Sequence, residues 1–67
     1  MKLKNIVIYL PQKELYLEVG QELVGNDGKK LGIFTKEIVL NEDGSIELER
    51  SNEEKFIFKN ATYSYKI

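Results

Sequence analysis

The chain has 67 residues, contains neither cysteine nor histidine, and carries ten basic against eleven acidic residues for a net charge of −1. This composition excludes disulfides, thiolate metal sites and every Ser-His or Cys-His nucleophile. The charge balance argues mildly against a dedicated nucleic-acid binder, whose affinity depends on neutralising phosphates. Because 42% of the residues are hydrophobic, we expect one small core and a single domain over residues 1–67.

The first apolar run, residues 5–10, is hydrophobic on both strand faces. Such a run is typical of a strand covered on both sides, here by barrel closure or by another subunit. Pro11 ends the run, because proline cannot continue a central ladder. Residues 14–19 then alternate, which predicts a strand with Tyr16 facing outward. The expected inward side chains of that strand are Leu15, Leu17 and Val19.

Two Asp-Gly pairs, Asp27-Gly28 and Asp43-Gly44, separate runs of strand-forming residues and predict two hairpins. The long run between them, residues 30–40, changes its inward parity. One face carries Leu31 and Ile33, and the opposite parity carries Ile38 and Leu40. We therefore expect a bulge or bend near residues 34–36, of the kind that lets a short sheet curl.

The second half of the chain continues the strand pattern. Residues 45–50 alternate with Ile46 and Leu48 inward, a polar turn follows at 51–54, and residues 55–59 form an aromatic strand. Residues 61–67 have a strict period of two, with Tyr63 and Tyr65 expected in the core. No apolar period of 3.6 extends over a helix length. The prediction is an all-β fold, a small single-domain antiparallel barrel or a curled meander of five to six strands.

Residues 19–33 resemble the opening of PRC-barrel domains, in which a glycine, a short apolar strand, an Asp-Gly turn and a Lys-Leu-Gly-like step recur in that order. Residues 37–46 resemble the second hairpin of the same family, so the resemblance covers about half the chain. The Pro-Trp-like step near the family's end has no counterpart around Phe58 to Tyr63. The resemblance implies a non-enzymatic module that docks onto a larger assembly, such as a ribosomal particle or a membrane-associated complex.

The acidic and glycine-rich positions do not match a known chemical site. Neither Asp-Gly stretch has the spacing of a calcium loop, so the glycines are interpreted as turn positions. The glutamates that alternate with apolar residues are interpreted as a solvated face. These are Glu47 and Glu49, followed by Glu53 and Glu54. We expect no catalytic residues, no metal site and no cofactor.

Several side chains fall off the inward parity of their strands, Ile57 among them. Four form the candidate interaction surface: Val7, Tyr9, Tyr16 and Phe34. Tyrosine is enriched at interfaces because it buries a large area at low entropic cost and keeps a polar tip. The leading hypothesis is a non-enzymatic protein-interaction or docking module, which acts as a subunit of a larger assembly or as a homo-oligomer.

Two alternatives stay open. The first is a small β-barrel nucleic-acid-binding protein that stacks bases on aromatic rings and contacts phosphates through lysines. Those lysines are Lys2, Lys4, Lys29, Lys30 and Lys36. The second is an accessory or inhibitor protein of a mobile element, which no residue separates from a docking module. No run approaches the ~18 apolar residues of a membrane span, and no cleavage site follows the first apolar run, so we expect a cytoplasmic protein.

Overall fold

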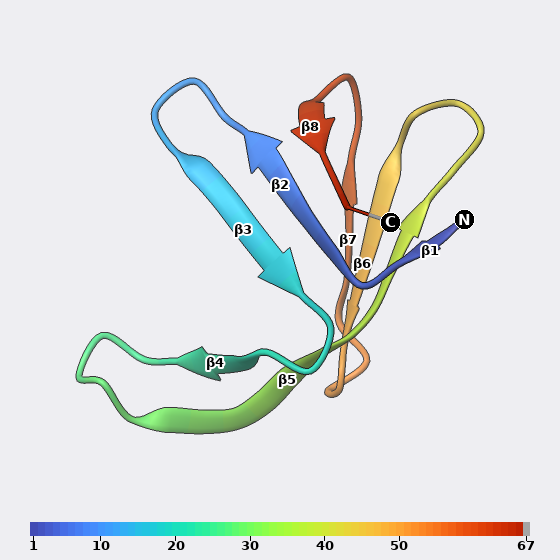
Figure 1. Cartoon of the computed structure of the whole chain (residues 1–67). Helices are drawn as coiled ribbons and strands as arrows, with labels where there is room; N and C mark the ends of the chain where they lie inside the picture. Colours follow the sequence, from blue (N-terminus) through green and yellow to red (C-terminus); the bar gives the residue numbers. More distant parts are fainter. Residues whose placement is uncertain (67) are drawn as a thin grey trace.

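Residues 1–66 are described by a computed structural model, and strands are the only regular elements in that range (Figure 1). The strands are β1 (Lys2–Leu3), β2 (Asn5–Tyr9), β3 (Glu14–Glu18), β4 (Glu22–Val24), β5 (Lys30–Leu40), β6 (Ile46–Arg50), β7 (Lys55–Phe58) and β8 (Thr62–Ser64). The all-β prediction is confirmed. Residues 1–66 contain eight strands where five to six were expected, and three of them, β1, β4 and β8, are only two or three residues long. Ile67, where the expected last strand ends, lies outside the described residues.

The strands form two antiparallel sheets. The five-stranded sheet has the order β1-β5-β6-β7, with β4 paired to the first half of β5, and the three-stranded sheet has the order β3-β2-β8. The chain leaves the first sheet after β7, and β8 pairs with β2, so that Tyr63 lies opposite Ile8. The two sheets do not close into a barrel. Of the two architectures expected from the sequence, the curled meander is therefore the one observed.

The core lies between the two sheets and is built from side chains that alternate along their strands. Its buried residues are Leu3, Ile6, Ile8, Leu17, Ile38, Ile46 and Leu48. Burying one such side chain contributes about 1.5–3 kcal/mol, so these few residues supply most of the driving force for folding. Ile46 and Leu48 are inward as predicted. Tyr63 and Tyr65 are half-buried against this core, and their rings stack with centroids 6.2 Å apart.

A bulge at Lys36 divides β5 into two halves. Thr35 lies opposite Arg50 and Glu37 opposite Glu49, so Lys36 is the extra residue. The predicted bend near residues 34–36 is confirmed. Because one inserted residue changes the parity of a strand, Thr35 is buried in one half and Ile38 in the other.

The half of β5 before the bulge forms an arm with β4, seen as the green hairpin at the lower left of Figure 1. No side chain from residue 19 to residue 34 is buried. The radius of gyration is 12.1 Å, compared with about 11 Å for a compact domain of this length. The prediction that Val19 and Leu31 face the core is wrong, because this part of the chain leaves the region between the sheets and exposes both side chains.

Three hairpin turns share one hydrogen-bond pattern. In each, the first residue donates its N–H to the C=O of the fifth, the fourth donates to the C=O of the first, and the fifth donates to the side chain of the third. The turns span residues 25–29, 41–45 and 50–54. The fourth residue has positive φ in all three: Gly28 at 82°, Gly44 at 87° and Glu53 at 71°. Both Asp-Gly predictions are confirmed, and the third turn has Asn52 and Glu53 in the same two places.

Glu53 is the outlier among these turns, since a residue with a Cβ is disfavoured at positive φ by roughly 1–2 kcal/mol. We expect Glu53→Gly to raise the free energy of unfolding by about 0.5–1 kcal/mol, because the greater freedom of glycine in the unfolded chain offsets part of the relief. Urea unfolding measures this change. Gly44→Ala, at the equivalent place in the second turn, is the matched control and should destabilise the fold. A Glu53→Gly protein no more stable than the wild type contradicts this account of the turn.

The carboxylate of Asp43 makes the stability of the second turn depend on pH. Its Oδ1 accepts hydrogen bonds from the Ser45 hydroxyl at 2.6 Å and the Ser45 N–H at 2.9 Å. Both bonds favour the carboxylate, the hydroxyl bond more strongly, and they hold the pKa of Asp43 below its usual value.

Because the pKa of Asp43 is lower in the folded state than in the unfolded state, its contribution to stability is complete above about pH 4 and is lost as the pH falls through the folded value. We expect the stability difference between the wild type and Asp43→Asn to be constant near neutral pH and to shrink below about pH 4. Urea unfolding across this range measures it, with Glu42→Gln as the charge-matched control. A difference that stays constant in acid would show that the hydrogen bonds to Ser45 do not act through ionisation.

Candidate interaction surface

Three of the four predicted surface residues lie together on the outer face of the three-stranded sheet. Ile6 and Ile8 of β2 point into the core, so alternation places Val7 and Tyr9 on the opposite face. The strand register puts Tyr16 of β3 directly across from Val7. Tyr9 and Tyr16 are 41% and 49% exposed, whereas Val7 is half-buried. We call Val7, Tyr9 and Tyr16 the tyrosine face.

Hydrogen bonds tether both rings of the tyrosine face at their polar ends. The Tyr9 hydroxyl is 3.0 Å from Ser64 Oγ on β8, and the Tyr16 hydroxyl donates to Glu18 Oε2 at 3.0 Å. The bond to Glu18 favours the protonated phenol and raises the pKa of Tyr16. A surface depression lies next to Val7 and Tyr16. It is lined by Asn5, Val7, Tyr16, Ser64, Tyr65 and Lys66. The face therefore offers an apolar strip with polar groups along its border.

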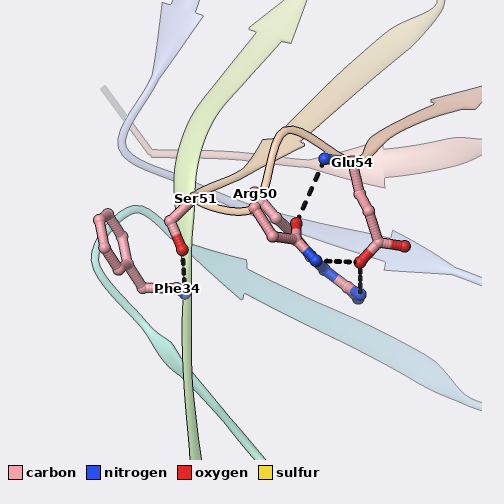
Figure 2. A network of polar contacts seen from close by, with 5 residues as sticks. Phe34, Arg50, Ser51 and Glu54 are labelled. Atoms are coloured by element: carbon pink, nitrogen blue, oxygen red, sulfur yellow. Dashed lines mark hydrogen bonds and ion pairs between the residues drawn. The ribbon is translucent and has the colours of Figure 1, made fainter.

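Phe34, the fourth predicted residue, belongs to the other sheet. It lies on β5 at the base of the arm, where its N–H donates to Ser51 Oγ at 3.1 Å and its C=O accepts the Ser51 N–H at 2.9 Å (Figure 2). These two bonds join the arm to the β6–β7 turn. The Phe34 ring is exposed, but the structure places it apart from the tyrosine face.

The same turn holds Arg50 against an aromatic ring. The guanidinium carbon of Arg50 is 4.5 Å from the centroid of Phe56. The Nη1 of Arg50 is 4.0 Å from Glu54 Oε1 (Figure 2). Asn52 in turn donates to Glu54 Oε1. This cation–π contact and its polar neighbours fix the turn to which the arm is attached.

Two exposed apolar side chains, Val24 and Leu31, were not predicted from the sequence. Ile57, by contrast, was predicted to lie off the inward parity of its strand, and it is exposed between the half-buried Phe56 and Phe58. Val24 and Leu31 gave no such signal. They belong to regular strand patterns, and alternation shows which side chains share a face without showing what covers it.

The lysines of the nucleic-acid hypothesis do not gather on one surface. Lys2 lies on β1, which pairs with the end of β5 at Val39, and its amine is 3.5 Å from Glu37 Oε2. Lys30 begins β5 at the opposite end, beside the tip of the arm. Figure 1 shows these two ends of β5 on opposite sides of the molecule.

Comparison with known proteins gives this surface no precedent: no protein family, curated protein or solved structure matches the chain. Residues 1–66 contain no group of three or more acidic residues placed to hold a metal ion. Over the same residues there is also no helix of the length and hydrophobicity needed to cross a membrane. The exposed faces are therefore the features of the molecule that bear on its function.

The tether between Tyr16 and Glu18 can be tested by titration. We expect Glu18→Gln to bring the pKa of Tyr16 down toward the ordinary value of about 10, because the hydrogen-bonded carboxylate that disfavours the phenolate is gone. NMR-detected titration of the tyrosine rings measures the shift, with Tyr16→Phe identifying the signal. An unchanged Tyr16 titration in Glu18→Gln would mean that the ring is not held in this position in solution.

Proposed function

We propose that this chain is a non-enzymatic interaction module that binds a protein partner through the tyrosine face. The observation that carries the proposal is the pair of exposed tyrosines beside Val7 on one face of the three-stranded sheet. A domain of this size has few apolar side chains to place in its core. Leaving two large rings on one outer face is typical of a surface that a partner covers.

The hydrogen bonds at the border of the face support the same proposal. Tethers from Ser64 and Glu18 restrict the two rings before any partner arrives, which reduces the entropy lost on binding. Glu14 lies opposite Tyr9, and Lys66 lines the neighbouring depression, so charged groups surround the apolar strip. An apolar centre with a polar rim is the usual composition of a protein interface.

The resemblance of residues 19–33 and 37–46 to PRC-barrel domains supports a docking role on a larger assembly. The residues that carry this resemblance include the first two of the three turns that share one hydrogen-bond pattern. We also propose a cytoplasmic location, because small secreted domains commonly depend on disulfides and this chain has no cysteine to form them.

The proposal is tested by affinity capture from lysate of the native host with the wild-type chain and with the Tyr9→Ser/Tyr16→Ser double variant. We expect a defined partner with the wild type and its loss with the double variant. Truncating two interface rings should cost about 2 kcal/mol or more, which is roughly a thirtyfold weaker Kd. Titration of the captured partner by calorimetry measures that change.

Gln12→Ala, in the exposed β2–β3 turn, is the matched control and should retain the partner. Thermal unfolding should show all three proteins folded, because neither tyrosine is part of the buried core. Recovery of the same proteins in the same amounts by the double variant would overturn the proposal.

A further inference from the structure

The arm has a free edge. Among residues 1–66, β4 pairs with β5 alone, and the β4–β5 ribbon extends beyond the core without burying a side chain. A hairpin of two strands is marginal in water, and three or more strands are needed for a stable sheet. Yet the arm is hydrogen-bonded along its length. Its one register shift, between Glu22 and Val24, places the extra residues on β5 and leaves β4 continuous. Its tip is a hydrogen-bonded turn, and Glu22 Oε2 accepts the N–H of Gly32 at 3.1 Å across the ribbon.

Alternation shows which backbone groups of β4 face that edge. Gly25 donates its N–H to Lys29 across the hairpin, and Gln21 accepts the Thr35 N–H with its C=O. Odd-numbered residues of this segment therefore bond toward β5. In an antiparallel ladder neighbouring residues face opposite ways, so the N–H and C=O of Glu22 and Val24 point away from β5. The free edge presents two donors and two acceptors.

We propose that the occupant of this edge is the β4 strand of a second copy of the chain, paired antiparallel about a two-fold axis at Leu23. In this register Glu22 of one copy lies opposite Val24 of the other, and both residues have outward backbone groups. Each such pair exchanges two hydrogen bonds, and the symmetry makes two pairs. The two arms become one four-stranded ribbon, β5-β4-β4-β5, and neither copy keeps a two-stranded hairpin. This inference goes beyond the proposed function, because it uses a different surface.

The charges of the arm favour this register over its neighbours. A two-fold axis at Glu22 would set the two Glu22 carboxylates directly opposite each other, and like charges in that position destabilise a sheet. An axis at Val24 would place Glu22 opposite Asn26, which lies in the turn beyond the end of β4. The axis at Leu23 avoids both and keeps all paired residues within β4.

The same register is complementary across the dimer. Val24 pairs with Lys30 within one arm, so Glu22 of the first copy lies on the same face as Lys30 of the second, two strands or about 10 Å away. Two long side chains of opposite charge can approach each other over that separation once the Glu22 carboxylate releases the Gly32 N–H. Leu23 and its symmetry mate meet on the other face. Val24, which is 59% exposed in the single chain, gains a neighbouring strand.

Analytical ultracentrifugation of the full chain with a matched pair of variants tests the proposal. Val24→Pro removes an edge N–H without removing a bond to β5, whereas Val24→Thr keeps the N–H and the branched side chain. We expect a reversible dimer for the wild type and for Val24→Thr. Two symmetry-related hydrogen bonds are lost in Val24→Pro, so its Kd should rise about tenfold or more. A wild type that stays monomeric at millimolar concentration, or equal Kd values for the two variants, overturns the proposal.

A cysteine cross-link gives a second readout that does not depend on proline being tolerated. The chain has no cysteine, so Leu23→Cys introduces one thiol per copy. Directly opposed Cα atoms in an antiparallel pair are about 4.5–5.5 Å apart, within the range that a disulfide spans. We expect Leu23→Cys to form a disulfide-linked dimer under mild oxidation much faster than Ile57→Cys, an exposed control on β7. Equal rates would overturn the pairing at β4. Loss of the tyrosine face leaves both readouts unchanged, so failure here is distinguishable from failure of the proposed function.

Discussion

The bulge at Lys36 sets the layout of the whole molecule, because it lets one continuous strand belong to two environments. After the bulge, β5 supplies Ile38 to the core and is flanked by β1 and β6. Before it, the same strand leaves the core and is held at its base by the bonds of Thr35 to residues 20 and 21 and of Phe34 to Ser51. Only seven apolar side chains of residues 1–66 are buried, yet residues 19–34, about a quarter of the chain, lie outside the core.

Local hydrogen bonding explains the turns between strands, whereas long-range packing determines which strand faces are buried and which are exposed. The three turns have the same bonding pattern because an Asp or Asn in the third place accepts a backbone N–H and the fourth place adopts positive φ. These local bonds join neighbouring strands into hairpins, but they do not determine which other sheet or strand packs against the faces of those hairpins. In the three-stranded sheet, β2 and β3 form a local hairpin, whereas the pairing of β8 with β2 is long-range. The same pairing places Ser64 beside the Tyr9 hydroxyl.

This division explains what could be predicted. The two Asp-Gly turns, the bend in β5 and the inward positions of Ile46 and Leu48 all follow from short-range pattern and were predictable. Outward placement of Tyr9 and Tyr16 was also readable, because their neighbours in the strand are core residues. Leu31 could not be placed, since its strand pattern is the same whether or not another layer covers it. The separation of Phe34 from the tyrosine face could not be predicted either, because it depends on how the two sheets pack and not on spacing along a strand.

The hydrogen bond between Tyr9 and Ser64 joins residues that are 55 positions apart, and this has a consequence for the order of events during synthesis. A growing chain makes β2 and β3 early, yet β8, the third strand of their sheet, follows all the other described strands in the chain. Long-range pairing of this kind closes a large loop and is slow compared with hairpin formation. Until β8 arrives, Tyr9 lacks its tether and one edge of β2 is open. A chain cut before β8 would therefore lack the strand that borders Tyr9, and the outer face of the three-stranded sheet would be incomplete.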